Sequence, residues 1–248
     1  MDTSNPVLGR NTFSQFANTA RGEASARMSV QGTLNKSLLL IALAILSGGF
    51  SWAFLVSNPA LGLPLIVVAA IVAFVLAIVT AFRPQNSPVL APIYALCEGA
   101  VLGGISAFFA SAYAGIVPVA IGLTLAVPLV MLGLYRAGVL RATPAFTRMV
   151  IMATGGIALV YGVAFLMRLF GLSMPFLWTP TPIGIGIELV IVGIAALNFV
   201  LDFDFIERGA LQGAPKFMEW YGAFSLCVTL FWLYMEILRL LSMLNDRR

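Results

Sequence analysis

The sequence predicts an all-α integral membrane protein with seven transmembrane helices. Of its 248 residues, 60% are hydrophobic and only 10% are charged, whereas soluble domains carry roughly 25% charged residues. The mean hydropathy is +1.00, so a soluble globule of this composition would expose far too much apolar surface. Seven apolar runs, each of about 20 residues or more, follow one another along the chain, and each could cross a bilayer as a helix.

The elements are expected in a simple order. Residues 1–34 are rich in Ser, Thr, Asn, Ala and Gly and are expected to form a polar cytoplasmic tail, and residues 35–248 a seven-helix transmembrane domain. The apolar runs are 38–56, 63–82, 89–110, 116–135, 149–167, 183–203 and 220–244. The last run is longer than a span needs. Its helix could therefore start near Met218 or near Leu226.

The positive charges predict the orientation of the chain. Ten of the fourteen Lys and Arg residues lie before the first run or in the connections after the second, fourth and sixth runs. They are Arg10, Arg21, Arg27, Lys36, Arg83, Arg136, Arg141, Arg148, Arg208 and Lys216. Cytoplasmic loops carry an excess of Lys and Arg, so the N-terminus is expected in the cytoplasm. Seven spans would then place the C-terminus outside, although the final Asn-Asp-Arg-Arg argues weakly against this.

The composition also excludes several kinds of site. The chain has no His, which rules out His-based metal sites and Ser/His or Cys/His hydrolysis. Cys97 and Cys227 lie inside apolar runs and are expected to be buried small hydrophobes. We expect no cofactor and no enzymatic activity, because the only alternative, an intramembrane aspartyl protease, lacks its Gly-Asp type signature. The net charge of +4 fits membrane topology and lipid-surface charge better than nucleic-acid binding.

Acidic residues within the apolar runs are the candidate functional residues, because an unpaired carboxylate in hydrocarbon costs several kcal/mol. Glu98 lies in the middle of the third run, near the bilayer midplane. Gly99 and Gly103 follow it at the spacing of a helix-packing motif. We therefore expect Glu98 in the interior of the bundle, either in a functional role or as a protonated acid that hydrogen-bonds a neighbouring helix.

Two polar stripes are expected on the last two helices. Glu188 and Asp202 are fourteen residues apart, close to four helical turns, and share one face with Asn198. On the seventh run Ser225, Thr229, Trp232 and Glu236 form the second stripe. Arg239 lies one turn after Glu236 and is the alternative partner for it.

The start of the seventh helix decides which acids can meet. A start at Met218 places Glu236 at the level of Glu188, and a start near Leu226 brings it close to Asp202. Three further acids, Asp204, Glu207 and Glu219, flank the connection between the last two runs and are expected to be solvated, with Asp204 at the cytoplasmic lip of any path.

Three segments resemble the Bax inhibitor-1 family, also known as TMBIM-type membrane proteins, in its bacterial YccA-like branch. They are "MSVQGTLNKSLLLIALAILSGGFSW", "SPVLAPIYALCEGAVLGGIS" and "LDFDFIERGALQGAPKFMEWYGAFSLCVTLFWLYMEILRLLS". The resemblance runs from about Met28 to Leu244 and implies a bacterial inner (plasma) membrane protein whose last helix is central among the other six. It also implies a pH-sensitive calcium leak that uses two acids on the last two helices.

The resemblance assigns these acids to residues of this chain. Asp202 matches the family's aspartate on the sixth span, although it begins Asp-Phe-Asp here and not Asp-Thr-Gln. Glu236 matches the aspartate on the seventh span and has a longer side chain. Glu98 matches the family's Glu-Gly. Asp202, Glu236 and Glu98 are therefore the expected ion pathway and pH latch, and Glu188, Asp204 and Arg239 are secondary candidates.

The sequence leaves two functional hypotheses open. The first is a passive cation pathway, for Ca²⁺ above all, gated by a proton that Asp202 and Glu236 share, because like charges disfavour double ionisation. Ca²⁺ prefers oxygen ligands and would bind transiently at these two acids. The second is a non-conducting regulator that binds another membrane protein, such as a quality-control protease. Membrane lipids are expected around the chain in either case, nucleic acid is not, and the sequence leaves the oligomeric state open.

Overall fold

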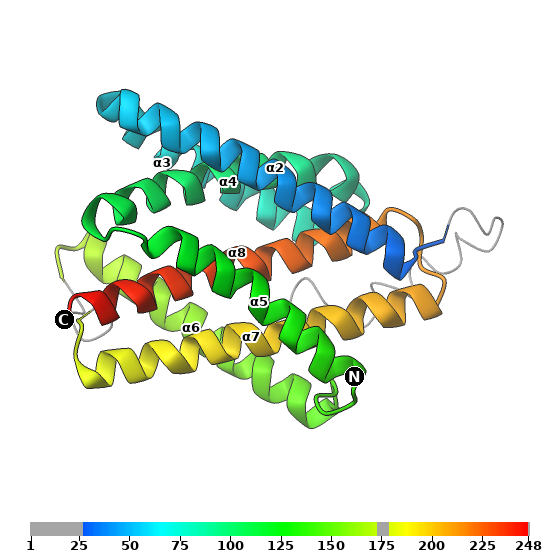
Figure 1. Ribbon diagram of the computed structural model, residues 1–248. Coiled ribbons are helices and arrows are strands. Elements are labelled where there is room, and N and C mark those ends of the chain that lie inside the picture. Colours follow the sequence, from blue (N-terminus) through cyan, green and yellow to red (C-terminus); the bar gives the residue numbers. More distant parts are fainter. Residues whose placement is uncertain (1–26, 173–178, 248) are drawn as a thin grey trace. The chain divides into compact units, whose positions relative to one another are not determined.

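Seven helices make up the computed structural model, which describes residues 27–172 and 179–247 (Figure 1). Each is long and apolar enough to cross a membrane. They are α2 (Val30–Ser57), α3 (Pro59–Phe82), α4 (Ser87–Ala112), α5 (Ile116–Arg136), α6 (Pro144–Leu169), α7 (Pro182–Leu211) and α8 (Met218–Asn245), with one short 3-10 turn, η2 (Pro84–Asn86). The predicted all-α architecture with seven transmembrane helices is confirmed.

Local capping explains where several helices begin. The Oγ of Ser29 accepts a hydrogen bond from the Gly32 N–H at 3.0 Å, which satisfies a free donor of the first turn of α2. That helix therefore begins at Val30, before the apolar run, and takes in the end of the polar segment 1–34. At α6 the Thr143 side chain caps the helix, and Pro144 occupies the first turn. Pro59 likewise opens α3, which leaves only Asn58 between α2 and α3.

The chain forms two compact units, and α7 and α8 each contribute to both. The described part of unit 1 comprises residues 27–112 and 202–231, that is, α2, α3, α4, the end of α7 and the start of α8. Unit 2 comprises the described residues 113–172, 179–201 and 232–247, that is, α5, α6, the start of α7 and the end of α8. Each unit therefore holds part of each polar stripe predicted on the last two helices.

Glycines allow α4 to pack closely on α2 within unit 1. A Cβ atom at Gly99 would collide with the backbone of Ala44, and one at Gly103 would collide with the backbone of Gly48. Such close backbone approach is how helices gain packing energy in lipid, where burial of apolar side chains gives little. The Gly99 and Gly103 pair therefore acts as the spacing predicts.

Burial differs strongly between helices. In the most apolar stretch of α8, 61% of the residues are buried, against 11% in α3 and in α6. Large apolar side chains such as Ile71, Phe74 and Val75 of α3 are exposed, which suits a lipid-facing helix. Of the seven described helices, α8 therefore has the largest buried share.

One contact relates the end of α8 to a loop of unit 2. The Tyr113 Oη donates a hydrogen bond to Asp246 Oδ1 at 2.6 Å, and this bond to a carboxylate raises the pKa of Tyr113 above its ordinary value. The end of the chain therefore lies beside the connection between α4 and α5. The connection between α4 and α5 follows three of the described helices, and the end of α8 follows all seven. Because both numbers are odd, the two places are expected on the same side of the membrane, which agrees with this contact.

Candidate functional site

Asp202 is a buried carboxylate held by hydroxyl groups. It lies in α7, and only 4% of its surface is exposed. The Ser225 Oγ donates to Asp202 Oδ1 at 2.6 Å, and the Thr229 Oγ1 donates to Asp202 Oδ2 at 2.7 Å. Both donors lie on α8, one helical turn apart, so the predicted polar stripe on α8 faces Asp202 within unit 1.

Glu98 lies one turn from a tyrosine that packs against α8. The ring of Tyr94 meets the ring of Phe224 edge-on, with 5.0 Å between centroids, and Tyr94 lies close enough to Glu98 and Cys227 to interact electrostatically with both. The Glu98 side chain is half-buried, and within the described residues it forms no ion pair. Glu98 and Asp202 thus both belong to unit 1, and Asp202 also lies near Cys227.

A second group of charges lies in unit 2, on α6, α7 and α8. Glu188 Oε2 is 3.0 Å from Arg239 Nε, and Arg239 Nη2 also forms an ion pair with Glu236 Oε2. Glu236 accepts further hydrogen bonds from Trp232 Nε1 at 2.7 Å and from Tyr161 Oη at 3.1 Å. Both carboxylates are buried, with 1% of Glu188 and 3% of Glu236 exposed. We call these five residues the Arg239 cluster.

The start of α8 bears on the latch expected from the sequence. The helix begins at Met218, the earlier of the two possible starts, and Glu236 shares Arg239 with Glu188. This is the arrangement that the earlier start predicts. The described partners of Asp202 are hydroxyls, and those of Glu236 are Arg239, Tyr161 and Trp232, so a proton shared between Asp202 and Glu236 stays a prediction.

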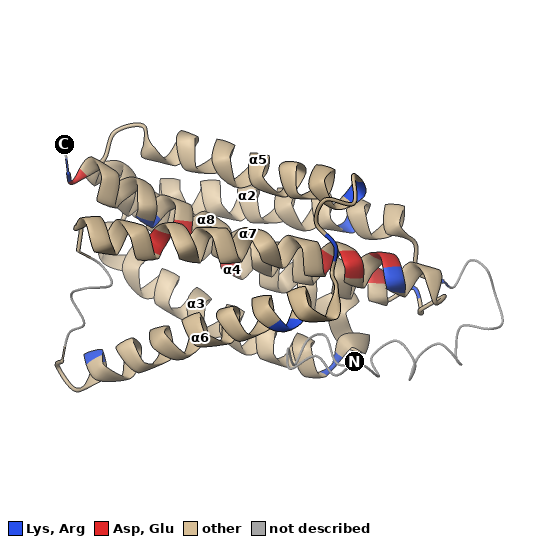
Figure 2. Ribbon diagram, turned by 90° about the horizontal axis from the view of Figure 1, so that it is seen from below, with Lys and Arg blue, Asp and Glu red and all other residues tan. Residues whose placement is uncertain are grey.

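The remaining polar residue of the α7 stripe is satisfied by a neighbouring helix. Asn198 Nδ2 donates to Thr154 Oγ1 of α6 at 2.9 Å and to the Ile194 carbonyl at 2.8 Å. Figure 2 shows the acidic positions of α7 in two separate stretches with uncharged helix between them. Asn198 lies in that interval and is an uncharged polar link between α6 and α7.

The acids at the end of α7 differ in their surroundings. Asp204 is partly exposed, and its Oδ2 forms an ion pair with Arg208 Nε at 2.8 Å, four residues along the helix. Glu207 is exposed. An exposed end of this kind was expected, and such surface pairs contribute little to stability.

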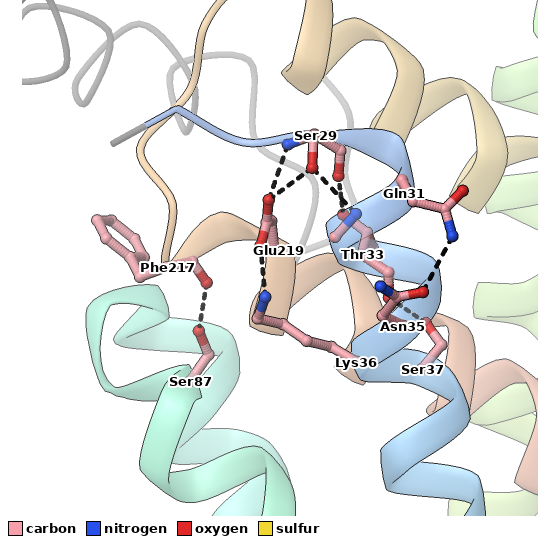
Figure 3. A network of polar contacts seen from close by, with 10 residues as sticks. Ser29, Gln31, Thr33, Asn35, Lys36, Ser37, Ser87, Phe217 and Glu219 are labelled. Atoms are coloured by element: carbon pink, nitrogen blue, oxygen red, sulfur yellow. Dashed lines mark hydrogen bonds and ion pairs between the residues drawn. The ribbon is translucent and has the colours of Figure 1, made fainter. Parts of the chain in front are cut away.

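Glu219 contradicts the expectation that it is solvated. It is 1% exposed, and its carboxylate accepts hydrogen bonds from the Ser29 N–H and from the Ser29 Oγ, each at 2.9 Å. Its other oxygen forms an ion pair with Lys36, whose ammonium also lies 5.5 Å from the centroid of the Trp220 ring. Figure 3 shows how this carboxylate lies between the start of α2 and the start of α8. The prediction was wrong because Ser29, directly before α2, and Lys36 on α2 both contact Glu219 and cover it.

Three polar partners of these residues are not apparent from the sequence. Tyr161 and Thr154 lie on α6, whose sequence has no acidic residue to mark it, and Lys36 stands out in the sequence only as one of the positive charges that predict topology. Their partners come from distant parts of the chain. For α6, the sequence indicates a possible contact with another helix only through polar residues within an apolar run, such as Tyr161.

Carboxylates are not gathered densely enough to form a metal cage. Within residues 27–172 and 179–247, no three Asp, Glu or Cys side chains are placed to hold one metal ion. A Ca²⁺ ion bound by protein usually has six to eight oxygen ligands. The described residues therefore hold no such group of ligands, and transient binding of Ca²⁺ at Asp202 or Glu236 stays a prediction.

Comparison with known proteins identifies the family. The chain matches the family model described as Bax inhibitor 1 like over residues 5–246, nearly its whole length. No curated protein and no solved structure matches it. The match agrees with the seven transmembrane helices and with the resemblance carried by the three sequence segments. The chain therefore belongs to the Bax inhibitor-1-like family of integral membrane proteins.

Proposed function

We propose that this protein is a pH-sensitive passive cation leak, with Ca²⁺ as its principal ion, gated by protonation of carboxylates inside the membrane. The environment of Asp202 carries this proposal. A buried carboxylate whose described partners are two hydroxyls has no ion-pair partner among the described residues to neutralise it. Such a group in a membrane helix is functional by default, because its charge is expensive.

The two hydroxyls suit both charge states of Asp202. When the carboxylate is ionised, Ser225 and Thr229 each donate a hydrogen bond to it, as their distances show. When it is protonated, either hydroxyl can rotate and accept the new O–H, because Ser and Thr are donors and acceptors at once. Protonation therefore changes the charge in the path without leaving a buried polar group unpaired, which is what a pH gate requires.

The charge of Asp202 determines the direction of gating. An ionised carboxylate attracts a cation and a protonated one does not, so flux should rise as the pH rises. Ca²⁺ fits because it prefers hard oxygen ligands, and the path offers carboxylate and hydroxyl oxygens. A site with so few carboxylates binds Ca²⁺ weakly, which favours conduction of the ion over its retention.

The pairing of Asp202 with Glu236 that the sequence predicts has a separate test by crosslinking. On a background without Cys97 and Cys227, Asp202→Cys together with Glu236→Cys should form a disulfide if the two acids share a proton. Glu188→Cys together with Glu236→Cys is the matched pair. A disulfide in that second pair alone would remove Asp202 from the latch and leave Glu188 in its place.

Ion flux in liposomes tests the leak itself. The purified full-length chain would be reconstituted with an entrapped Ca²⁺ dye, and dye signal would be followed at two pH values beside protein-free liposomes. The proposal predicts Ca²⁺ entry above the protein-free rate, and faster entry at the higher pH. Entry no faster than in protein-free liposomes at either pH would contradict the leak and favour a non-conducting regulator of another membrane protein.

A further inference from the structure

The Arg239 cluster has a net negative charge when both of its carboxylates are ionised. Glu188 and Glu236 contribute two negative charges when both are ionised, and Arg239 contributes one positive charge. Tyr161 of α6 and Trp232 of α8 are neutral partners. An excess charge buried in a membrane helix bundle is costly unless a proton or a cation compensates it.

The two carboxylates are not equally satisfied. Glu236 accepts hydrogen bonds from Trp232, Tyr161 and Arg239, which is the set expected for a stable carboxylate. Glu188 has only the contact of its Oε2 with Arg239 Nε at 3.0 Å. Its Oε1 is buried and has no hydrogen-bond partner, and the Arg239 Nε–H is not aligned for a hydrogen bond either.

We propose that the Arg239 cluster is a proton-binding site, with the proton on Glu188 Oε1 at neutral pH. Glu188 is then neutral, Glu236 and Arg239 form a balanced ion pair, and the excess charge disappears. The groups that face Glu188 are Glu236 and Arg239 from α8 and Tyr161 from α6. Glu188 takes the proton because Glu236 already accepts three hydrogen bonds to its charged form.

A proton fits this site better than a metal ion. Arg239 places a permanent positive charge beside Glu188 Oε2, and this charge repels a second cation. The described residues also lack a third carboxylate or thiol here, so a divalent ion would lack most of its ligands. A proton needs only one oxygen and carries no ligand shell.

Loss of the proton would change the contacts between α7 and α8. An ionised Glu188 competes with Glu236 for the same guanidinium, because Arg239 contacts both. The site would therefore couple pH to the pairing of the two helices in unit 2. This inference does not require ion conduction, so it stands or falls apart from the proposed leak.

Infrared spectroscopy of the full-length protein in lipid membranes tests the proton directly. A protonated carboxylic acid has a C=O stretching band that an ionised carboxylate lacks, and the band shifts in D₂O. At neutral pH, Glu188→Gln should remove one component of this band. Glu219→Gln is the matched control and should leave the band intact, because Glu219 is ion-paired with Lys36. An unchanged band in Glu188→Gln would overturn the proposal.

Thermal unfolding of the same variants supplies a second readout. If Glu188 is neutral, the isosteric Glu188→Gln should leave the melting temperature at neutral pH unchanged, whereas Glu236→Gln should lower it because a charged partner of Arg239 is lost. A melting temperature that falls as far in Glu188→Gln as in Glu236→Gln would contradict the proton site, because Arg239 would then lose a charged partner at either position.

Discussion

Glu219 is a buried acid that connects two segments far apart in the sequence. Its carboxylate contacts Ser29 and Lys36, which are more than 180 positions away in the chain. Ser29 also caps α2 through its Oγ, so Glu219 holds the residue that starts this helix. The contact between Ser29 and Glu219 therefore positions α2, the first described helix, against the start of α8.

Removal of this carboxylate should destabilise unit 1. Glu219→Ala leaves the ammonium of Lys36 and the N–H of Ser29 without their partner, which should cost on the order of 3 kcal/mol. Glu219→Gln should cost less, since an amide oxygen still accepts from Ser29. Unfolding in detergent, followed by circular dichroism, measures both changes.

An exposed residue nearby provides the control for this measurement. Gln212 is exposed between α7 and α8, and Gln212→Ala should change stability by no more than about 0.5 kcal/mol. If Glu219→Ala were as stable as Gln212→Ala, the contacts of Glu219 would carry no stability.

Partners of single residues were the part of the site that the sequence could not predict. The stripe of Ser225 and Thr229 on α8 could be read from helical spacing, and both hydroxyls do contact Asp202. The contacts of Tyr161 and Lys36 could not be predicted in this way. Each joins two different helices, and the rotation of one helix relative to another produces no periodic pattern in the sequence. The burial of Glu219 is unpredictable for the same reason, since it depends on contacts with Ser29 and Lys36 in a distant part of the sequence.

At the scale of helices, α2 and α4 depend on close approach of their backbones. Gly103 has no side chain, and a Cβ there would meet the backbone of Gly48. Gly122 of α5 is the opposite case, because a Cβ there would meet nothing within 4 Å. These two glycines offer a matched pair for measuring what the contact contributes.

Substitution by Ala should act with opposite sign at the two positions. Gly103→Ala forces α2 and α4 apart and should destabilise the protein by about 1–3 kcal/mol, as overpacking does. Gly122→Ala should be neutral or stabilise by up to about 1 kcal/mol, because Ala favours the helix. Thermal unfolding of both variants in one detergent measures the difference. Equal effects of the two substitutions would contradict close packing at Gly103.

Helices were more predictable than contacts because their signal is local. The seven apolar runs fall within the seven helices, since hydrocarbon thickness sets both. The ends differ where capping decides, as at Ser29, which starts α2 before its apolar run. For α8 the sequence allowed two starts. The helix begins at Met218, because the 215–217 segment forms turns that lead directly into it.

At the scale of the whole molecule, the positive charges predict the orientation in the membrane, and thiol labelling measures it. The positive charges predict that the connection between α7 and α8 is cytoplasmic and that Ser111, at the end of α4, is outside. Ser111 and Gln212 are both exposed. On a background without Cys97 and Cys227, Ser111→Cys should react with an impermeant thiol reagent added outside intact cells, and Gln212→Cys should react only after the membrane is opened. The reverse pattern would invert the orientation.

In the proposed leak, Asp202 is the group that we expect to confer pH sensitivity. Asp202→Asn keeps a group that can hydrogen-bond Ser225 and Thr229, so the fold should be retained, but it removes the charge that titrates. A variant that melts like the unmodified protein can therefore be compared with it at the level of ion flux.

The most direct test is Ca²⁺ flux through the unmodified protein and through Asp202→Asn in liposomes, at several values from roughly pH 5 to 8, where shifted carboxylates titrate. The ratio of ionised to protonated acid changes about tenfold for each pH unit. The unmodified protein should therefore conduct several-fold faster at the upper end of this range. Asp202→Asn should give nearly the same flux throughout. A full pH response that persists in Asp202→Asn would contradict the central role of this carboxylate.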